Sequence, residues 1–376
     1  MIANSLTAYL LGGLIFVTGM LMANILHIQY PVGQGGLHLG IIGNTAYIYD
    51  CGCLHGSKAN IKNIFRDIQK RLNNCNALNI YISHLHTDHY NLLKTLDKYI
   101  SSSIKTQLFL PQITTVDKIQ LLFTDPSLKD TTNDYNEIYN TISENRIEYL
   151  TNIKEQITLY SQSIETYIRK IYEKFILLPY VIGIDSTEIE SFVNMLAQDK
   201  NTPEKLWSIL KEPKEFLKFK QLFEKKFPGK ISSHGGENNV MLCLYCGADM
   251  CESHWCSFID RSFFNPCGFN IYGAWLHTGD AGLTINQNLQ DFYGYYKYVI
   301  PNVSFVQIPH HGSKNNHDMW FSKIFNHMGL NTIFYFTTQK TGTTKNKLTD
   351  LRLLKQQLYK VTDVSTTGIQ IKGQII

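Results

Sequence analysis

The apolar positions of this chain form short strand-like runs near both ends and longer helix-like periods between them. Residues 37–42 and 45–49 are apolar runs that flank Gly43-Asn44, and a short turn pair in that place predicts a β-hairpin. Between residues 61 and 72 the apolar side chains recur at steps of three and four, which predicts a helix with one buried face. Residues 78–82 form another strand-like run. This order of elements is typical of an α/β protein.

The middle third of the chain has a different amino-acid composition. Residues 112–230 are rich in Lys, Glu, Tyr, Ile and Asn and are nearly free of glycine. An apolar stripe predicts a long helix that begins near Asn136, and such a stripe needs a helical partner. The stripe consists of Leu150, Ile153, Ile157, Tyr160, Ile164, Ile168, Ile171 and Phe175. We therefore expect residues 112–230 to be a helical insertion, either a lid or substrate platform or an element for packing or dimerisation. Its lysine-rich end, residues 205–230, is either a solvated helix face or a phosphate-binding patch.

Four metal-binding side chains lie within six positions directly after the strand-like run at residues 78–82. They are His84, His86, Asp88 and His89. Side chains alternate between the two faces of a strand, so His84 and His86 point the same way, and Asp88 and His89 can reach the same space from the turn that follows. Imidazole suits zinc, iron or manganese, and a carboxylate among the ligands is typical of a hydrolytic rather than a structural site. The pattern predicts a metal centre.

The run from Ser83 to His89 resembles the signature of the metallo-β-lactamase-fold hydrolases. Further segments resemble one subgroup, the C-terminal domains of competence DNA-uptake channels (ComEC-like) and their stand-alone relatives. These segments are Val32-Gly33-Gln34-Gly35, Ile48-Tyr49-Asp50-Cys51-Gly52, Asn239-Val240-Met241-Leu242, residues 275–280, residues 307–314, and a closing hairpin at 361–371. Two departures from the subgroup pattern are Gly36, where an aspartate is expected, and the lack of a His-Pro pair after residues 333–336.

The resemblance implies a four-layer αββα sandwich made of residues 25–111 and 231–376. It also implies two divalent ions, Zn²⁺ or Mn²⁺, at one edge of the two sheets. Asp280 would bridge the ions. The expected ligand sets are His84, His86 and His234 for the first ion, with His254 as an alternative to His234, and Asp88, His89 and either His310 or His311 for the second.

The tandem histidines follow the strand-like run at residues 303–308. Neighbouring residues on a strand face opposite ways, so one of the pair should bind metal while the other contacts substrate or packs in the fold. We favour His310 as the ligand. His277 is out of phase with Asp280 and is expected to be structural. Asp50, at the end of its strand, either orients a metal-bound histidine or forms a turn before Gly52.

Two such ions would activate water for attack on a phosphorus or carbonyl centre. Asp88 would also orient the nucleophile, and the spare histidine of the pair, with Ser313 and Lys314 behind it, would protonate or neutralise the leaving group. The subgroup resemblance implies a phosphodiesterase or nuclease-like enzyme whose partner is a phosphodiester or nucleic acid. Two alternatives remain: a lactone, thioester or β-lactam hydrolase on the same centre, and a metal-stabilised interaction protein without activity.

Composition agrees with a globular enzyme. The chain has 376 residues, 44% of them hydrophobic, which is enough for a large core. A net charge of +4 permits a phosphate-bearing partner without requiring one. The eight cysteines are expected to be reduced core thiols of a cytoplasmic protein, and strand alternation separates Cys243 from Cys246, which argues against a zinc knuckle there.

The N-terminal segment is the one part that suggests a membrane. Residues 6–26 carry no charge and are long enough to span a bilayer, yet the first Lys or Arg of the chain is Lys58, so no basic flank is present. Residues 25–30 are also needed as the first strand of the fold. Residues 1–24 are thus either a membrane anchor or an apolar leader or buried segment.

Overall fold

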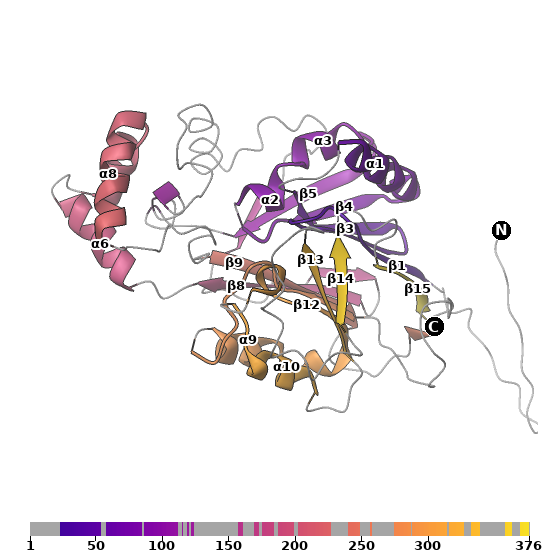
Figure 1. The fold of residues 1–376 in the computed structure, drawn as a ribbon. Helices are drawn as coiled ribbons and strands as arrows, with labels where there is room; N and C mark the ends of the chain where they lie inside the picture. The colour runs from indigo at the N-terminus through magenta and orange to yellow at the C-terminus, as the bar shows by residue number, and fades with distance from the viewer. Residues whose placement is uncertain are drawn as a thin grey trace, which may run out of the picture.

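Two mixed β-sheets lie face to face in the computed structural model of this protein, and helices cover both outer faces (Figure 1). This is the α/β, four-layer αββα arrangement expected from the sequence. The structure describes residues 23–53, 58–84, 86–111, 115, 119, 122–123, 157–160, 169–172, 175–183, 187–198, 202–226, 240–248, 256–257, 274–286, 288–313, 316–326, 332–338, 358–362 and 369–375.

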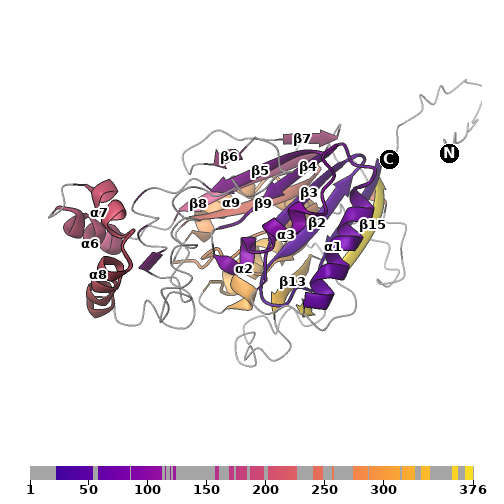
Figure 2. The same ribbon diagram turned by 90° about the horizontal axis from the view of Figure 1, so that it is seen from above.

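The first sheet has the strand order β10-β15-β1-β2-β3-β4-β5-β6. Its strands are β1 (Ala23–Gln29), β2 (Leu37–Ile42), β3 (Thr45–Cys51), β4 (Ala77–Tyr81), β5 (Lys105–Pro111), β6 (Ile157–Tyr160), β10 (Cys256–Ser257) and β15 (Ile369–Ile375). The predicted hairpin is present as β2 and β3, with Gly43 at a φ of 60° in the turn. Helices α1 (Lys58–Leu72), α2 (Thr87–Tyr90) and α3 (Leu93–Asp97) lie over one face of this sheet (Figure 2).

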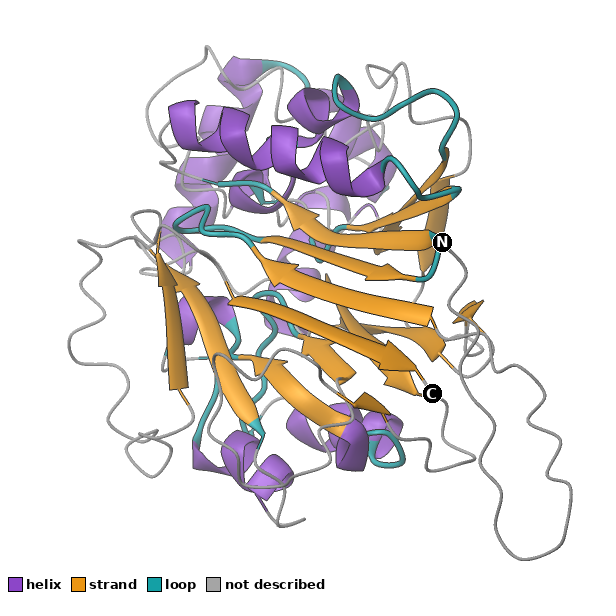
Figure 3. Cartoon of the chain, turned by 90° about the vertical axis from the view of Figure 1, so that its right-hand side faces the viewer, coloured by secondary structure: helices purple, strands orange, loops and turns teal. Residues whose placement is uncertain are grey.

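The second sheet has the strand order β14-β13-β12-β11-β9-β8-β7. Its strands are β7 (Arg169–Tyr172), β8 (Phe175–Gly183), β9 (Val240–Ala248), β11 (Ala274–His277), β12 (Val303–Gln307), β13 (Ile333–Thr338) and β14 (Leu358–Thr362). Its outer face packs against α9 (Leu289–Tyr296) and α10 (Met319–Asn326) through a continuous apolar core (Figure 3). Two short 3₁₀ turns, η2 (Ile300–Asn302) and η3 (His310–Gly312), flank β12.

Three hydrophobic cores lie between the successive layers of the sandwich. The predicted helix α1 turns its apolar face, with Phe65 and Ile68 fully buried, onto the first sheet. A second core fills the space between the two sheets and includes Tyr49 from one and Leu244 from the other. The third lies beneath α9 and α10. Each sheet therefore buries both faces, which explains why most of its strands read as continuous apolar runs.

A separate helical unit is formed by α6 (Thr187–Gln198), α7 (Pro203–Ile209) and α8 (Pro213–Lys226). These helices stand beside the sandwich in Figure 1 and enclose an apolar core of their own, which includes Phe216 and Phe223. Thr202 caps α7 by accepting a hydrogen bond from the backbone N–H of Lys205. Part of the 112–230 segment is therefore helical, as expected.

The expectation that residues 112–230 are helical throughout is wrong. Ile157 and Tyr160 lie in β6, Ile171 lies in β7 and Phe175 begins β8, so the predicted helical stripe ends in three strands. β8 pairs with β9 along nine residues and belongs to the sandwich core, so the chain rejoins the sandwich well before residue 231. Apolar spacing alone gave the wrong prediction, because isoleucine and tyrosine are also strong strand formers. The backbone hydrogen bonds of these residues are made with neighbouring strands, and sequence spacing does not reveal those partners.

The expected closing hairpin at residues 361–371 is also wrong. β14 pairs with β13 in the second sheet, whereas β15 pairs with β1 and β10 in the first. The last two strands of the chain thus belong to different sheets and do not pair with each other. β15 covers the edge that β1 would otherwise expose.

The cysteines that the structure describes as free are all buried: Cys51, Cys53, Cys75, Cys243 and Cys246. This agrees with the prediction of core thiols. Cys243 packs beneath α9 and α10 and Cys246 packs between the sheets, so the two thiols cannot share a zinc ion. Within the described part of the chain no helix is long and apolar enough to cross a membrane, and residues 1–22 lie outside that part.

A polar network crosses the space between the two sheets. The hydroxyl of Tyr47 lies 3.2 Å from His27 Nδ1, 3.2 Å from His38 Nε2 and 3.3 Å from His277 Nε2, and His277 Nδ1 lies 2.9 Å from the hydroxyl of Tyr335. All five side chains are fully buried. Burial lowers the pKa of His27 to about 3 and holds the pKa values of His38 and His277 well below their ordinary range. His277 is structural, as the sequence predicted.

This network predicts that the protein loses stability in acid. Below pH 6.5 the unfolded chain protonates histidines that the folded chain keeps neutral, so stability falls as the pH drops from 6.5 towards the lowered folded-state pKa. Each such histidine contributes a slope of about 1.4 kcal/mol per pH unit. His38→Gln removes one of them, so the wild type should lose stability faster than the variant between pH 6.5 and 5. Urea unfolding at several pH values, with chelator present, measures this; a stability difference that does not change with pH would contradict it.

Candidate metal centre

The expected metal ligands gather where strands of both sheets end. β3 and β4 are parallel, and so are β11 and β12, so the carboxyl ends of each pair lie at one edge of its sheet. The segments that follow β4, β11 and β12 carry His84 to His89, Asp280, and the tandem histidines. A backbone hydrogen bond from Leu242 N–H to the Ser83 carbonyl, 2.8 Å long, ties the two sheets together at this edge. Sequence-distant ligands therefore converge.

Glycines allow the backbone segments beneath the centre to approach closely. A side chain at Gly52 would lie 2.4 Å from the carbonyl carbon of Asp88, and one at Gly279 would lie 2.7 Å from the Ser83 Cβ. Gly279 also has a φ of 54°, which favours glycine. Gly52 and Gly279 therefore make room for the loops that carry the expected ligands.

Gly36 lies directly against the side chain of Asp50. A Cβ at this position would lie 2.6 Å from the Asp50 Cβ and 2.8 Å from Asp50 Oδ2. The Asp50 side chain therefore fills the space that an aspartate at position 36 would need.

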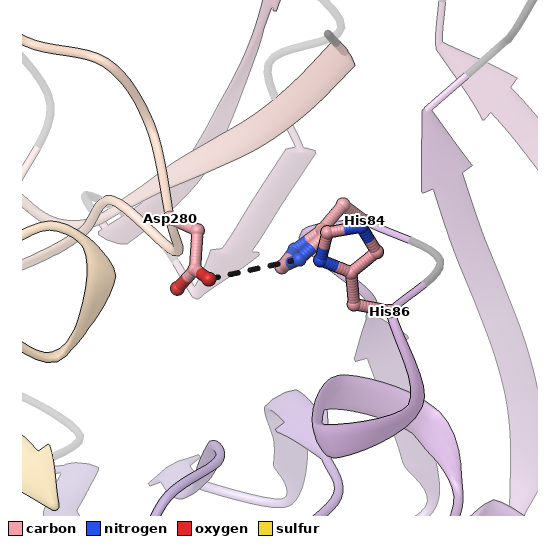
Figure 4. A group of neighbouring side chains, drawn as sticks. All are labelled: His84, His86 and Asp280. Atoms are coloured by element: carbon pink, nitrogen blue, oxygen red, sulfur yellow. Dashed lines mark ion pairs between the residues drawn. The ribbon is translucent and has the colours of Figure 1, made fainter. Parts of the chain in front are cut away.

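Two groups of side chains could each hold one metal ion. The first is His84, His86 and Asp280, and the second is Asp88, His89 and His311; within each group the ligand atoms lie within 4.8 Å of one another. Figure 4 shows the Asp280 carboxylate facing the two imidazoles of the first group. Most of these side chains are buried, with Asp280 only 3% exposed.

Asp280 joins the two groups through its two oxygens. Its Oδ2 lies 3.8 Å from His84 Nε2, and its Oδ1 lies 3.4 Å from His89 Nε2 and 3.8 Å from His311 Nε2. Each oxygen thus faces a different group, an arrangement in which one carboxylate could bridge two ions. The arrangement agrees with the bridging role expected for Asp280.

Asp50 holds the second group in place from behind. His89 donates its Nδ1–H to Asp50 Oδ2 at 2.8 Å, and the backbone N–H and hydroxyl of Ser83 also donate to this carboxylate, at 2.7 and 3.0 Å. Of the two roles considered from the sequence, this contact favours the first, in which Asp50 orients a histidine of the expected ligand set. Asp50 has a φ of 57°, an unfavourable backbone conformation that these hydrogen bonds stabilise.

Two residues that the sequence did not single out support the same loops. The Ser83 hydroxyl lies 2.9 Å from His84 Nδ1. The Gln307 side-chain oxygen accepts hydrogen bonds from the backbone N–H groups of Thr278 and Gly279, at 3.2 and 3.3 Å, just before Asp280. Both lie inside motifs already noted, but no spacing rule marks a serine or a glutamine as a supporting residue.

The donor atoms fit a divalent cation. Nδ1 of His84 and Nδ1 of His89 are engaged by Ser83 and Asp50, which leaves each Nε2 buried and without a hydrogen bond. An imidazole whose second nitrogen donates to a carboxylate is typical of protein metal sites. Nitrogen and carboxylate donors suit Zn²⁺ and Mn²⁺.

The electrostatics of the centre also favour cations. Burial raises the pKa of Asp280, but the surrounding histidines more than offset this and hold it well below its usual range. The same balance of burial against His89 and His311 lowers the pKa of Asp88 to about 2. Burial lowers the pKa of His89, yet the three carboxylates around it raise it well above its ordinary value. Burial holds His84 neutral by lowering its pKa. The buried, ionised carboxylates are stabilised by nearby positive charge, which metal ions bound in the two groups would supply.

The structure separates the tandem histidines, but not as the sequence suggested. They lie in the η3 turn, with φ values of 48° and 52°, so strand alternation does not apply to them. His311 Nε2 lies 3.4 Å from Asp88 Oδ2, within the second group. His310 Nε2 lies 3.6 Å from Asp280 Oδ2, and its side chain is 20% exposed, twice as much as that of His311. The geometry therefore favours His311 as the ligand, whereas the sequence favoured His310.

Some of the expected residues lie outside the described part of the chain. These are His234, its alternative His254, and Lys314. A third histidine for the first ion therefore stays a prediction. Ser313 follows η3 and donates its backbone N–H to the His310 carbonyl at 2.8 Å.

No protein-family model and no curated protein sequence matches the chain. Among solved structures, it is similar to the metallo-β-lactamase fold protein YhfI from Bacillus subtilis, with 9% identity and a TM-score of 0.41 over 93% of this chain and 100% of that one. It is also similar to a diphosphatase of the PhnP family, with 7% identity and a TM-score of 0.39 over 94% and 99% of the two chains.

A long-form RNase Z from yeast is similar with 10% identity and a TM-score of 0.35, over 85% of this chain and 37% of that one. These similarities are too distant to carry an argument about substrate or mechanism. The fold class rests on the two sheets and their helical layers, and the site rests on its own geometry.

The bridging position of Asp280 predicts that both ions depend on it. The purified protein should bind about two equivalents of Zn²⁺ or Mn²⁺. Asp280→Ala should lower the metal content of both groups, while Asp291→Ala, on the exposed side of α9, should leave it unchanged. Elemental analysis after dialysis measures this; full occupancy in folded Asp280→Ala protein would disprove the bridging assignment.

The tandem histidines should behave differently when replaced. His311→Ala removes a donor of the second group, so that variant should lose about one of two equivalents of metal. His310→Ala should keep both. Metal titration of the two variants side by side tests the assignment, and the reverse pattern would restore His310 as the ligand.

Proposed function

We propose that this chain is a metal-dependent hydrolase that cleaves phosphodiesters, nucleic acids among them. The observation that carries the proposal is the pair of ligand groups joined by the two oxygens of Asp280. Two divalent ions held in these groups would supply a water nucleophile near neutral pH and would stabilise negative charge that develops on the substrate.

The residues of the chain would orient the reactants around these ions. Asp88 is ionised, and its Oδ2 lies beside His311 at the edge of the second group, where it would accept a hydrogen bond from the attacking water and orient it. His310 is the more exposed of the tandem histidines, with Nε2 directed towards the Asp280 carboxylate, so it would contact the phosphoryl group or the leaving group.

Phosphodiesters are the substrate class that the motifs favour. The support is the sequence resemblance to ComEC-like domains, together with a net charge of +4 that suits an anionic substrate. The same centre would serve a lactone, a thioester or a β-lactam, since any carbonyl that can reach both ions presents similar chemistry. These substrates therefore belong in the test.

The proposal predicts a specific pattern of activity. Protein loaded with Zn²⁺ or Mn²⁺ should hydrolyse bis-p-nitrophenyl phosphate faster than a lactone or a cephalosporin, and should lose activity with chelator and regain it with metal. Asp88→Asn should lower kcat by at least about 100-fold. Preference for the lactone or cephalosporin would establish the alternative hydrolase. No turnover of any substrate by fully loaded protein would indicate an interaction protein.

A further inference from the structure

Asn316 makes two hydrogen bonds to residues of the metal centre, although no motif marks it. Its side-chain Oδ1 lies 2.8 Å from His310 Nδ1, and its side-chain Nδ2 donates to the backbone carbonyl of Asp280 at 2.9 Å. Asn316 thus connects the loop after β12 with the turn after β11. It lies just before α10 and is partly buried.

The backbone around Asn316 holds it in this position. Its N–H donates to the Ser313 carbonyl at 3.1 Å, and its own carbonyl accepts from Leu283 N–H at 2.7 Å. Leu283 also forms an isolated β-bridge with His317. The two loops are therefore joined by main-chain and side-chain contacts at the same point.

These contacts determine which nitrogen of His310 carries a proton. A backbone carbonyl only accepts hydrogen bonds, so the Asn316 side chain must turn its NH₂ group to Asp280 and its oxygen to His310. The oxygen in turn requires a proton on His310 Nδ1. With Nδ1 held by Asn316, the imidazole directs its Nε2 towards the Asp280 carboxylate, 3.6 Å away, on the side of the metal centre.

The strained backbone of the tandem histidines shows why such support is needed. His310 and His311 both have positive φ values, which side chains other than glycine adopt reluctantly. His310 N–H donates to the Gly279 carbonyl at 3.0 Å, and Asn316 fixes the imidazole of the same residue. Backbone and side chain of His310 are thus both tied to the Asp280 turn.

We propose that Asn316 is the positioning residue for His310, fixing the Nδ1–H tautomer so that Nε2 faces the metal centre. The effect on turnover rests on the proposed function, but the tautomer does not. Asn316→Asp keeps an oxygen that accepts from Nδ1, whereas Asn316→Ala removes it. Asn288→Ala is the control: its side-chain amide donates to the Gly282 carbonyl at 3.4 Å, within the segment that joins β11 to α9, and makes no contact with His310.

The test is long-range ¹H–¹⁵N NMR of metal-free protein with ¹⁵N-labelled histidines, with the His310 signals assigned from His310→Ala. The wild type, Asn288→Ala and Asn316→Asp should show His310 with a proton on Nδ1. Asn316→Ala should show a mixture or the Nε2–H form. An Nε2–H tautomer in the wild type, or an unchanged tautomer in folded Asn316→Ala, would overturn the proposal.

Kinetics of the loaded enzyme give a second measurement. Asn316→Ala should lower kcat by about 10- to 100-fold, the range typical of residues that support a metal site, with a smaller change in KM, and Asn316→Asp should recover most of the loss. Equal losses in Asn316→Ala and Asn288→Ala would show a merely structural role. If the wild type lacks diesterase activity, the proposed function fails while the NMR result still decides the role of Asn316.

Discussion

A buried carboxylate between two groups of histidines is the constraint around which this protein is built. Asp280 is 3% exposed, and Asp50 and Asp88 lie nearby at 0% and 7% exposure. Ionised carboxylates in such a place are very costly unless positive charge and hydrogen bonds surround them. The surrounding imidazoles supply part of this compensation, and the two groups of donor atoms are arranged so that divalent cations would supply the rest.

The layers of the fold bring these groups together. Parallel strands in each sheet direct their carboxyl ends to one edge, and the Leu242–Ser83 backbone hydrogen bond joins the sheets there. Buried histidines occur both in the network around Tyr47 and in the candidate metal centre. Comparing them shows how the surroundings of a histidine set its pKa. His38 and His277, packed among tyrosines and Trp275, remain neutral because burial lowers the pKa of each. His89, equally buried but beside carboxylates, has a raised pKa.

Local signals predicted much of this architecture. The hairpin around Gly43 and the helix α1 depend on neighbours in sequence, and both are present in the structure. The candidate ligands from His84 to His89 also lie within the two groups that could hold metal. The place of β8 depends on pairing with β9, some sixty residues later, and the sequence pattern alone suggested a helix there. The closing strands were misjudged for the same reason, because partners in different sheets decide their pairing.

The candidate site likewise contains residues that the sequence predicted and residues whose roles only the structure shows. His84, His86, Asp88 and His89 were recognisable from residue type and spacing, whereas Asp280 was expected from the family resemblance. The roles of His310 and His311 depend on a turn with two positive φ values, which no alternation rule describes. Supporting residues such as Ser83 and Gln307 act through hydrogen bonds that only the folded chain brings together.

The central claim is that Asp280 joins two metal ions. Anomalous diffraction from crystals grown with Zn²⁺ or Mn²⁺ tests it most directly, because it locates each ion independently of activity. Two anomalous peaks are expected about 3.5–4 Å apart, one beside His84 and His86 and the other beside Asp88, His89 and His311, with one Asp280 oxygen on each. A single peak, or two peaks of which only one contacts Asp280, would contradict the account.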